Sequence, residues 1–287
     1  MIKRLVLLLL LFSLAFAEFK LEGVDVVIND IQKDGSARVT EHIKIFVVGT
    51  YEQEKYKAGL GNNDLSSWAE LTSLGEVKMH ISSTNVDILG FSLRPQTLNR
   101  CDPFLDLCHG ELILSYIAKP YFNKTTGESI TGTGLFSVDN YKPRTTRYLL
   151  NPAALNFRTA QRASVTNSSA IPEISNDIII LDKNIYLTVD FPSNTVILDV
   201  SQAPENIELT TPTASVSELR WTNTILGQFV LSFEVEENLD KEVVEFFSAV
   251  PRKMKQVLES EQGMGTLAII VILIASYAYL KSMEKKR

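Results

Sequence analysis

Two cysteines and three histidines are the side chains of this sequence best suited to bind a metal or to react covalently. Cys101 and Cys108 stand in the segment Cys-Asp-Pro-Phe-Leu-Asp-Leu-Cys. In an oxidising compartment, the simplest interpretation of this pair is a disulfide that closes a short loop. The alternative is a metal site that uses both thiolates and His109, but the sequence offers no clear fourth ligand. We therefore predict the Cys101–Cys108 disulfide.

Other sequence patterns do not identify a catalytic centre. His42, His80 and His109 do not have the spacing of a zinc motif, and the chain contains no Gly-x-Ser-x-Gly nucleophile elbow. The segment Gly127-x4-Gly132-Thr133 resembles a phosphate-binding loop, but threonine stands where that loop has lysine. We predict no catalytic residue, cofactor or metal. A site assembled from distant histidines and carboxylates is left open.

Two apolar segments predict where the chain resides. Lys3 and Arg4, the apolar run Leu5–Leu14 and the small-x-small triplet Ala15-Phe16-Ala17 form the pattern of a secretory signal peptide, residues 1–17. An uncleaved anchor is the alternative, and it would export the same residues. Residues 264–280 carry no charge and no proline, and as a helix they would rise about 25 Å, near the lower limit for a bilayer core.

This order predicts a single-pass protein of the cell membrane. Its N-terminal domain would lie outside, and residues 281–287 would form a basic cytoplasmic tail. The sequons at Asn123 and Asn167 are then candidate glycosylation sites. The exported region has an acidic net charge of −11, with 22 Lys and Arg against 33 Asp and Glu. That charge argues against nucleic acid as a partner, because nucleic acid requires a basic surface.

Alternation of apolar and polar residues predicts that the exported region is mostly β structure. Residues 19–49 predict a β-hairpin with its turn at Lys33-Asp34-Gly35-Ser36. Glu41 falls on the apolar row of the second strand. We expect it at the rim of the sheet, in contact with water, and the alternative is that it pairs with a buried donor. Further strands are predicted at 77–81, 86–93 (limited by Pro95), 112–121 and, as about five short strands, between 178 and 235.

Residues 50–75 interrupt the β pattern. Ser67-Trp68-Ala69-Glu70 matches a helix capping box, and Leu65, Trp68 and Leu71 recur at helical spacing, which predicts a short helix. Trp68 has two interpretations, a ligand platform or a core residue that docks the helix on a sheet. We expect the core position.

The predicted hairpin also carries a resemblance. Its segment Asp34-Gly35-Ser36-Ala37-Arg38-Val39-Thr40-Glu41 resembles the Asp-Gly-Ser-x-x-Val-x-Glu opening found in a group of archaeal and bacterial membrane proteins. In those proteins an extracytoplasmic β domain is tethered by hydrophobic spans, often several, whereas this chain has one predicted C-terminal span. The resemblance implies a tethered β domain and no catalytic residue.

The predicted fold is mostly β, with one or two antiparallel β-sandwich domains, a juxtamembrane helix and one C-terminal transmembrane helix. A boundary between residues 160 and 172 would separate a first domain (18–165) from a second (170–238), and the alternative is one continuous sandwich. Residues 239–262 have an apolar seam at helical spacing. This helix would dimerise, pack on the sandwich or lie on the membrane.

These features predict a non-enzymatic, membrane-anchored extracytoplasmic binding or assembly protein, for example an adhesion protein or an envelope-complex subunit. Its partners would be the membrane and another protein, or a second copy bound through the juxtamembrane helix. The alternative is a membrane-tethered envelope hydrolase or its accessory subunit.

Overall fold

The structure is a computed structural model, and it describes residues 18–122, 130, 132–142, 144–160, 178–205 and 216–236. All of them belong to a compact unit that ends at Glu236. The predicted signal peptide, juxtamembrane helix, transmembrane helix and tail lie outside these residues, as do both sequons. Within the described ranges, no helix is long and apolar enough to cross a bilayer.

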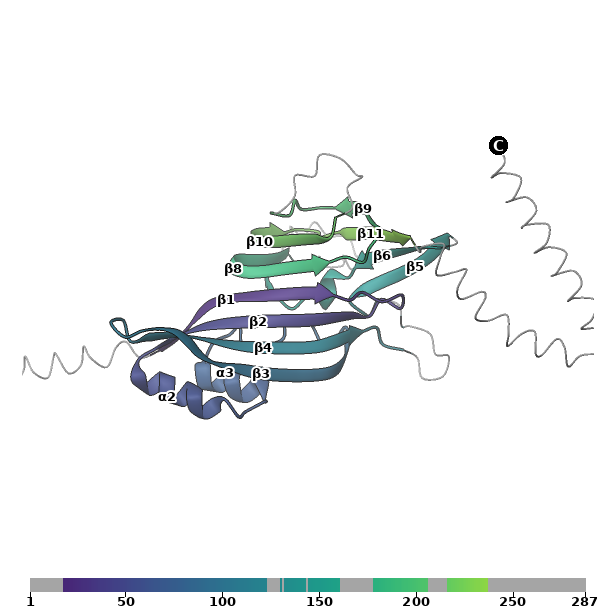
Figure 1. The fold of residues 1–287 in the computed structure, drawn as a ribbon. Coiled ribbons are helices and arrows are strands. Elements are labelled where there is room, and N and C mark those ends of the chain that lie inside the picture. Colours follow the sequence, from purple (N-terminus) through teal and green to yellow (C-terminus); the bar gives the residue numbers. More distant parts are fainter. Residues whose placement is uncertain are drawn as a thin grey trace, which may run out of the picture. The chain divides into compact units, whose positions relative to one another are not determined.

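The larger of two sheets has seven strands, in the order β10-β8-β1-β2-β4-β3, with β7 paired to β8 (Figure 1). Its strands are β1 (Glu18–Asn29), β2 (Ala37–Val48), β3 (Asp87–Asp102), β4 (Leu107–Lys119), β7 (Arg158–Ala160), β8 (Ile178–Asp190) and β10 (Glu218–Leu226). β1 and β2 pair antiparallel around the Asp34-Gly35 turn, which confirms the predicted hairpin.

The smaller sheet has four strands, in the order β5-β6-β11-β9. They are β5 (Phe136–Lys142), β6 (Thr145–Leu150), β9 (Thr195–Val200) and β11 (Leu231–Glu236), and a short 3-10 helix η1 (Pro152–Ala154) follows β6. Its buried side is aromatic, since the Tyr148 and Phe233 rings stack with centroids 5.0 Å apart and Phe136 meets both rings edge-on. The mostly β fold is therefore confirmed.

Residues far apart in the sequence share the larger sheet. β8 pairs parallel with β1, so that Val26 lies opposite Leu187. The other neighbour of β1 is β2, its antiparallel hairpin partner. The sheet thus joins strands from both sides of the predicted boundary between residues 160 and 172. The pairing of β1 with β8 adds a parallel pair to an otherwise antiparallel sheet.

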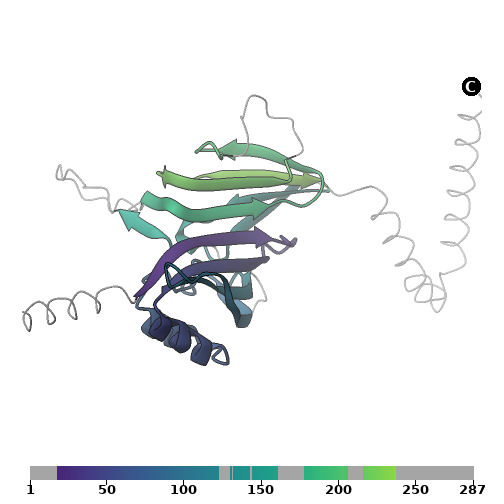
Figure 2. The same ribbon diagram turned by 60° about the vertical axis from the view of Figure 1, so that its left-hand side comes forward.

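Two short helices, α2 (Thr50–Gly59) and α3 (Leu65–Thr72), cover the β2, β4 and β3 side of the larger sheet, away from β8 and β10 (Figure 2). Only one helix was predicted here, and its expected cap was wrong. The N-cap of α3 is Asp64, whose carboxylate accepts a hydrogen bond from the Ser67 N–H at 2.9 Å. Trp68 is only 1% exposed, which confirms its core position.

Tyr56 fixes helix α2 to the sheet. Its hydroxyl donates to the Gln96 carbonyl oxygen and accepts from the Glu111 N–H, both at 2.9 Å. The Tyr56 ring packs directly on Gly110 of β4. Any side chain at position 110 would collide with this ring. Burial raises the pKa of Tyr56 to about 12, so the hydroxyl stays a donor at physiological pH.

The strand predicted at 77–81 is wrong, because this segment forms only an isolated bridge between Ile81 and Leu155. Its backbone is instead held by the buried Glu41 carboxylate, which accepts a hydrogen bond from the His80 N–H. The strand predicted at 86–93 continues through Pro95 to Asp102. A proline is tolerated there because β3 is an edge strand. Alternate N–H groups of an edge strand point away from the neighbouring strand, so a residue without an N–H can replace one of them.

We predict that Gly110→Ala lowers the free energy of unfolding by about 1–3 kcal/mol, because overpacking forces neighbouring groups to move. An added Cβ would lie 2.6 Å from Tyr56 Cε2. Denaturant unfolding of the full chain in detergent would measure the change. Gly61→Ala is the matched control, since a Cβ there meets nothing within 4 Å. Equal stability of both variants would contradict this account of the helix contact.

Candidate functional site

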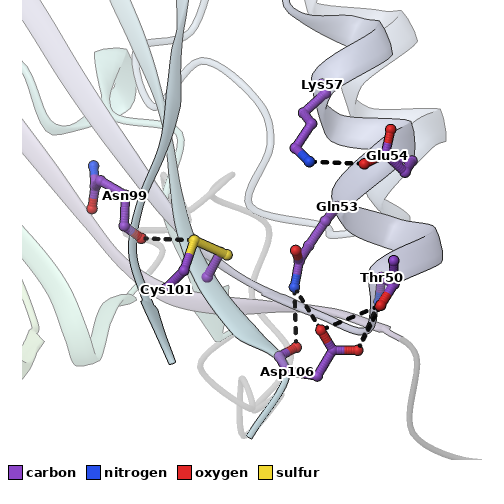
Figure 3. Close-up of a disulfide and its surroundings, with 8 residues drawn as sticks. Thr50, Gln53, Glu54, Lys57, Asn99, Cys101 and Asp106 are labelled. Carbon is purple, nitrogen blue, oxygen red and sulfur yellow. Dashed lines mark hydrogen bonds and ion pairs between the residues drawn. A yellow bond between two sulfur atoms is a disulfide. The ribbon is translucent and has the colours of Figure 1, made fainter. Parts of the chain in front are cut away.

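The hairpin between β3 and β4 is closed by the predicted disulfide. Cys101 is in β3 and Cys108 is in β4, and their Cα atoms are 4.0 Å apart (Figure 3). The prediction of this disulfide is confirmed. We call residues 101–108 the stapled tip, because the bond fastens the two strands directly below the turn.

The end of the stapled tip exposes two large apolar side chains. Phe104 is 96% exposed and Leu105 is 66% exposed, the first and third most exposed of the large apolar residues that the structure describes. Two hydrogen bonds hold their backbone, because the Asp102 carboxylate accepts from the N–H groups of Phe104 at 2.8 Å and Leu105 at 3.3 Å. The two side chains therefore project from a fixed turn.

The same tip also forms the N-terminal cap of helix α2. Gly49 precedes this helix and has no side chain to cap it. Asp106 supplies the missing acceptors, since its carboxylate binds the Thr50 N–H at 2.8 Å and Gln53 Nε2 at 3.0 Å (Figure 3). Its carbonyl oxygen accepts from the Gly49 N–H at 2.8 Å. A carboxylate at this end also interacts favourably with the helix dipole.

Charge and neighbouring residues complete the description of this surface. The stapled tip contains two aspartates, Asp102 and Asp106, and no Lys, Arg or His. Tyr51, in the first turn of the helix that Asp106 caps, is 67% exposed and adds a third large aromatic or apolar side chain. This surface combines exposed apolar groups, negative charge and a backbone fixed at three places. Such a surface is suited to binding rather than to bond-breaking chemistry.

A buried cluster around Glu41 is the one arrangement in the described residues that resembles a catalytic constellation. Glu41 is 0% exposed, so the prediction that it lies at the rim was wrong, and the alternative of a buried pair is correct. Its carboxylate accepts from the backbone N–H of His80 at 3.0 Å, from His80 Nδ1 at 2.7 Å and from the Tyr116 hydroxyl. On the other side of the ring, His80 Nε2 lies 3.1 Å from Glu76 Oε2.

The two carboxylates stabilise a charged imidazole at His80. Burial lowers the pKa of His80, but the hydrogen bonds and charges of Glu41 and Glu76 outweigh this and raise it above 6.5. The hydrogen bond from His80 lowers the pKa of Glu76. Burial and the neighbouring Glu41 charge raise the pKa of Tyr116 well above its ordinary value. The Tyr116 hydroxyl therefore keeps its proton near neutral pH.

This cluster is built to hold the fold together. The side chains of His80 and Glu41 are both 0% exposed, so a substrate could not touch them without displacing the surrounding residues. The Phe157 ring covers His80, with centroids 5.3 Å apart. A general acid or base must reach the proton that it transfers, directly or through one water. The cluster therefore explains local structure, and of its side chains Glu76 is the one that is partly exposed, at 24%.

The other two histidines are also paired with carboxylates. His42 Nδ1 lies 2.9 Å from Glu111, and His109 Nδ1 lies 2.8 Å from Glu22. The His42 side chain is half-buried, at 33% exposed. Within the part of the chain that the structure describes, no group of three or more His, Cys, Asp or Glu could hold a metal ion.

A polar cleft of about 600 Å³ lies beside the β1–β2 turn. Its lining includes both signs of charge, and Arg38 forms an ion pair with Asp30 at 3.8 Å. Asp34 accepts from the Ser36 hydroxyl at 2.5 Å. Lys33 and Lys119 line the cleft as well, so it carries both signs of charge and presents no exposed apolar anchor. The stapled tip remains the better candidate.

Sequence reasoning located the cysteines but missed the exposed pair between them. A signal was present, since Phe104 and Leu105 stand between two aspartates inside a loop too short to bury them. Asn123 and Asn167, the predicted glycosylation sites, lie outside the described residues. Comparison of the chain with models of known protein families and with curated proteins finds no match.

The buried cluster predicts a pH dependence of stability. A raised His80 pKa contributes stability that is present below pH 6.5 and is lost as the pH rises through the folded-state pKa. Glu76→Gln removes one carboxylate that raises this pKa, so the loss should begin at lower pH, and the variant should lose about 1.5–3 kcal/mol near pH 6. Denaturant unfolding of the full chain between pH 5 and about 9 would measure both effects. Glu70→Gln, on the exposed side of α3, is the control. Identical pH profiles for the wild type and Glu76→Gln would contradict the charged His80.

The capping of helix α2 by Asp106 predicts a second effect on stability. Asp106→Ala removes the acceptors for the first turn of α2 and should lower the free energy of unfolding by about 1 kcal/mol. Amide hydrogen exchange at Thr50 and Gln53 should increase, because local opening of this turn becomes easier. Asp199→Ala, at an exposed position of β9, is the matched control. Unchanged exchange in Asp106→Ala would show that the tip does not hold the helix.

Proposed function

We propose that this protein is exported, anchored in the cell membrane by residues 264–280, and acts by binding a partner through the stapled tip. The observation that carries the proposal is the exposure of Phe104 and Leu105 on a turn held by a disulfide and two aspartates. Phe104 and Leu105 contribute little to the stability of the unit itself, because they are exposed to water. Their burial against a partner would be favourable, because it removes apolar surface from water.

The disulfide supports the exported location. Structural disulfides persist in oxidising compartments and are rare in the cytoplasm of most organisms. In this proposal residues 1–17 direct export and residues 281–287 stay in the cytoplasm. Asn123 and Asn167 would then be exposed to glycosylation where the organism performs it. The remaining ectodomain serves as a β-rich scaffold that positions the tip.

The alternative of a tethered hydrolase gains no support from the described residues. Its best candidate acid and base, His80 and Glu41, are sealed in the core and bonded to each other. The open surface offers apolar contact and carboxylates already engaged in capping. Binding is thus the function that the site supports best.

Cysteine labelling would test the topology. Ile225→Cys, at a 61% exposed position of β10 far in sequence from the disulfide, should react with a membrane-impermeant maleimide on intact cells. Lys285→Cys, in the predicted tail, should react only after the membrane is permeabilised. The reverse pattern, or protection of both positions in intact cells, would overturn the exported, single-pass arrangement.

A further inference from the structure

We infer that the stapled tip fits an apolar pocket in another extracytoplasmic protein, and that cationic side chains surround that pocket. The inference rests on the proposed function and adds the chemistry of the partner. It follows from three features of the described residues: the position of the tip at one end of the unit, the charge of the tip, and the bonds that hold its backbone.

The tip and the last described residue lie at opposite ends of the unit. Glu18 at the start of β1 pairs with Val48, next to the Gly49 N–H that binds the tip at Asp106. β1 and β8 run parallel from this end, and β8 finishes at Asp190, near the other end of β1. Four residues later, Asn194 accepts a hydrogen bond from the Glu236 N–H.

The two ends of the unit are separated by about the length of β1, which has twelve residues and spans about 36–40 Å. In Figure 1 the β3–β4 turn and the end of β11 likewise lie at opposite ends of the sheets. The described unit thus presents the tip at the end away from Glu236.

The charge of the tip favours a protein partner over a lipid surface. Phe104 and Leu105 are flanked by Asp102 and Asp106, and residues 101–108 contain no cation, while a single exposed cation, Arg100, precedes Cys101. Insertion of the apolar pair would draw both carboxylates into the headgroup region, where anionic lipids repel them and desolvation is unfavourable. A protein pocket can instead place Arg or Lys beside the aspartates and form charge-assisted hydrogen bonds.

The fixed backbone favours a preformed pocket. The disulfide, the Asp102 turn and the Asp106 cap order the tip before binding, so association loses little conformational entropy in this loop. An aromatic side chain presented in this way is the usual centre of a protein interface, with a polar rim around it. Phe104 is the expected anchor, Leu105 its neighbour in the pocket, and the aspartates the rim.

Photocrosslinking of the full-length chain in its own membrane would test the inference. A photoreactive phenylalanine analogue at position 104 should form a protein adduct, whereas the same analogue at the exposed position 225 of β10 should not. Leu105→Asp should lower the adduct yield by about tenfold or more, because it puts a charge in the apolar pocket. Asp102→Asn keeps an acceptor oxygen for the turn but removes the charge, and should lower the yield about threefold to tenfold. Added salt should have a similar effect on the wild type.

A protein adduct supports the inference only when both substitutions lower its yield and position 225 does not form it. A lipid adduct at position 104, an equal yield from position 225, or no adduct at all would overturn it. An adduct that resists Asp102→Asn and salt would overturn the cationic rim. If Ile225→Cys is labelled on intact cells, the proposed topology stands. A protein adduct that resists the substitutions and salt then shows that only the partner chemistry is wrong, whereas no adduct at position 104 contradicts binding through the tip as well. If that cysteine is protected, the proposed function fails, and the inference fails with it.

Discussion

A single buried carboxylate, that of Glu41, sets the constraint on which much of the larger sheet depends. It lies in the apolar row of β2, where an unpaired charge would be strongly destabilising. The fold satisfies it with the backbone and ring of His80 and with the Tyr116 hydroxyl. These bonds hold the segment between α3 and β3 against the sheet. They also explain why this segment is irregular, since the His80 N–H donates to the Glu41 side chain instead of to a neighbouring strand.

The second constraint is the position of β1 between a local partner and a distant one. Its pairing with β2 needs only a short turn, whereas its pairing with β8 joins residues more than 150 positions apart in the chain. Closing such a distance is favourable because it buries apolar rows on both strands, with Val26 and Leu187 each 0% exposed. The continuous core then gives a rigid body between the tip at one end and Glu236 at the other.

The stapled tip joins stability to function. Asp106 caps a helix that Tyr56 fixes to β4, and the disulfide fastens β4 to β3. The turn that exposes Phe104 is therefore tied to the core through both a helix and two strands. Its apolar groups stay outside because the bonds that fix the turn also prevent it from folding back. A turn held by the protein's own bonds is the property that the proposed function requires.

The sequence by itself determined the local features: the 19–49 hairpin, the disulfide and the core position of Trp68. Each depends on a period, a turn or a pair of residues close together in the chain, and such patterns are readable without knowledge of distant neighbours. Only the tertiary structure decided the burial of Glu41, the parallel partner of β1 and the cap of α2. Their partners, His80, β8 and Asp106, stand 39 to more than 150 residues away. Non-local pairing is settled by competition among all buried surfaces and polar groups at once, and no short segment carries that information.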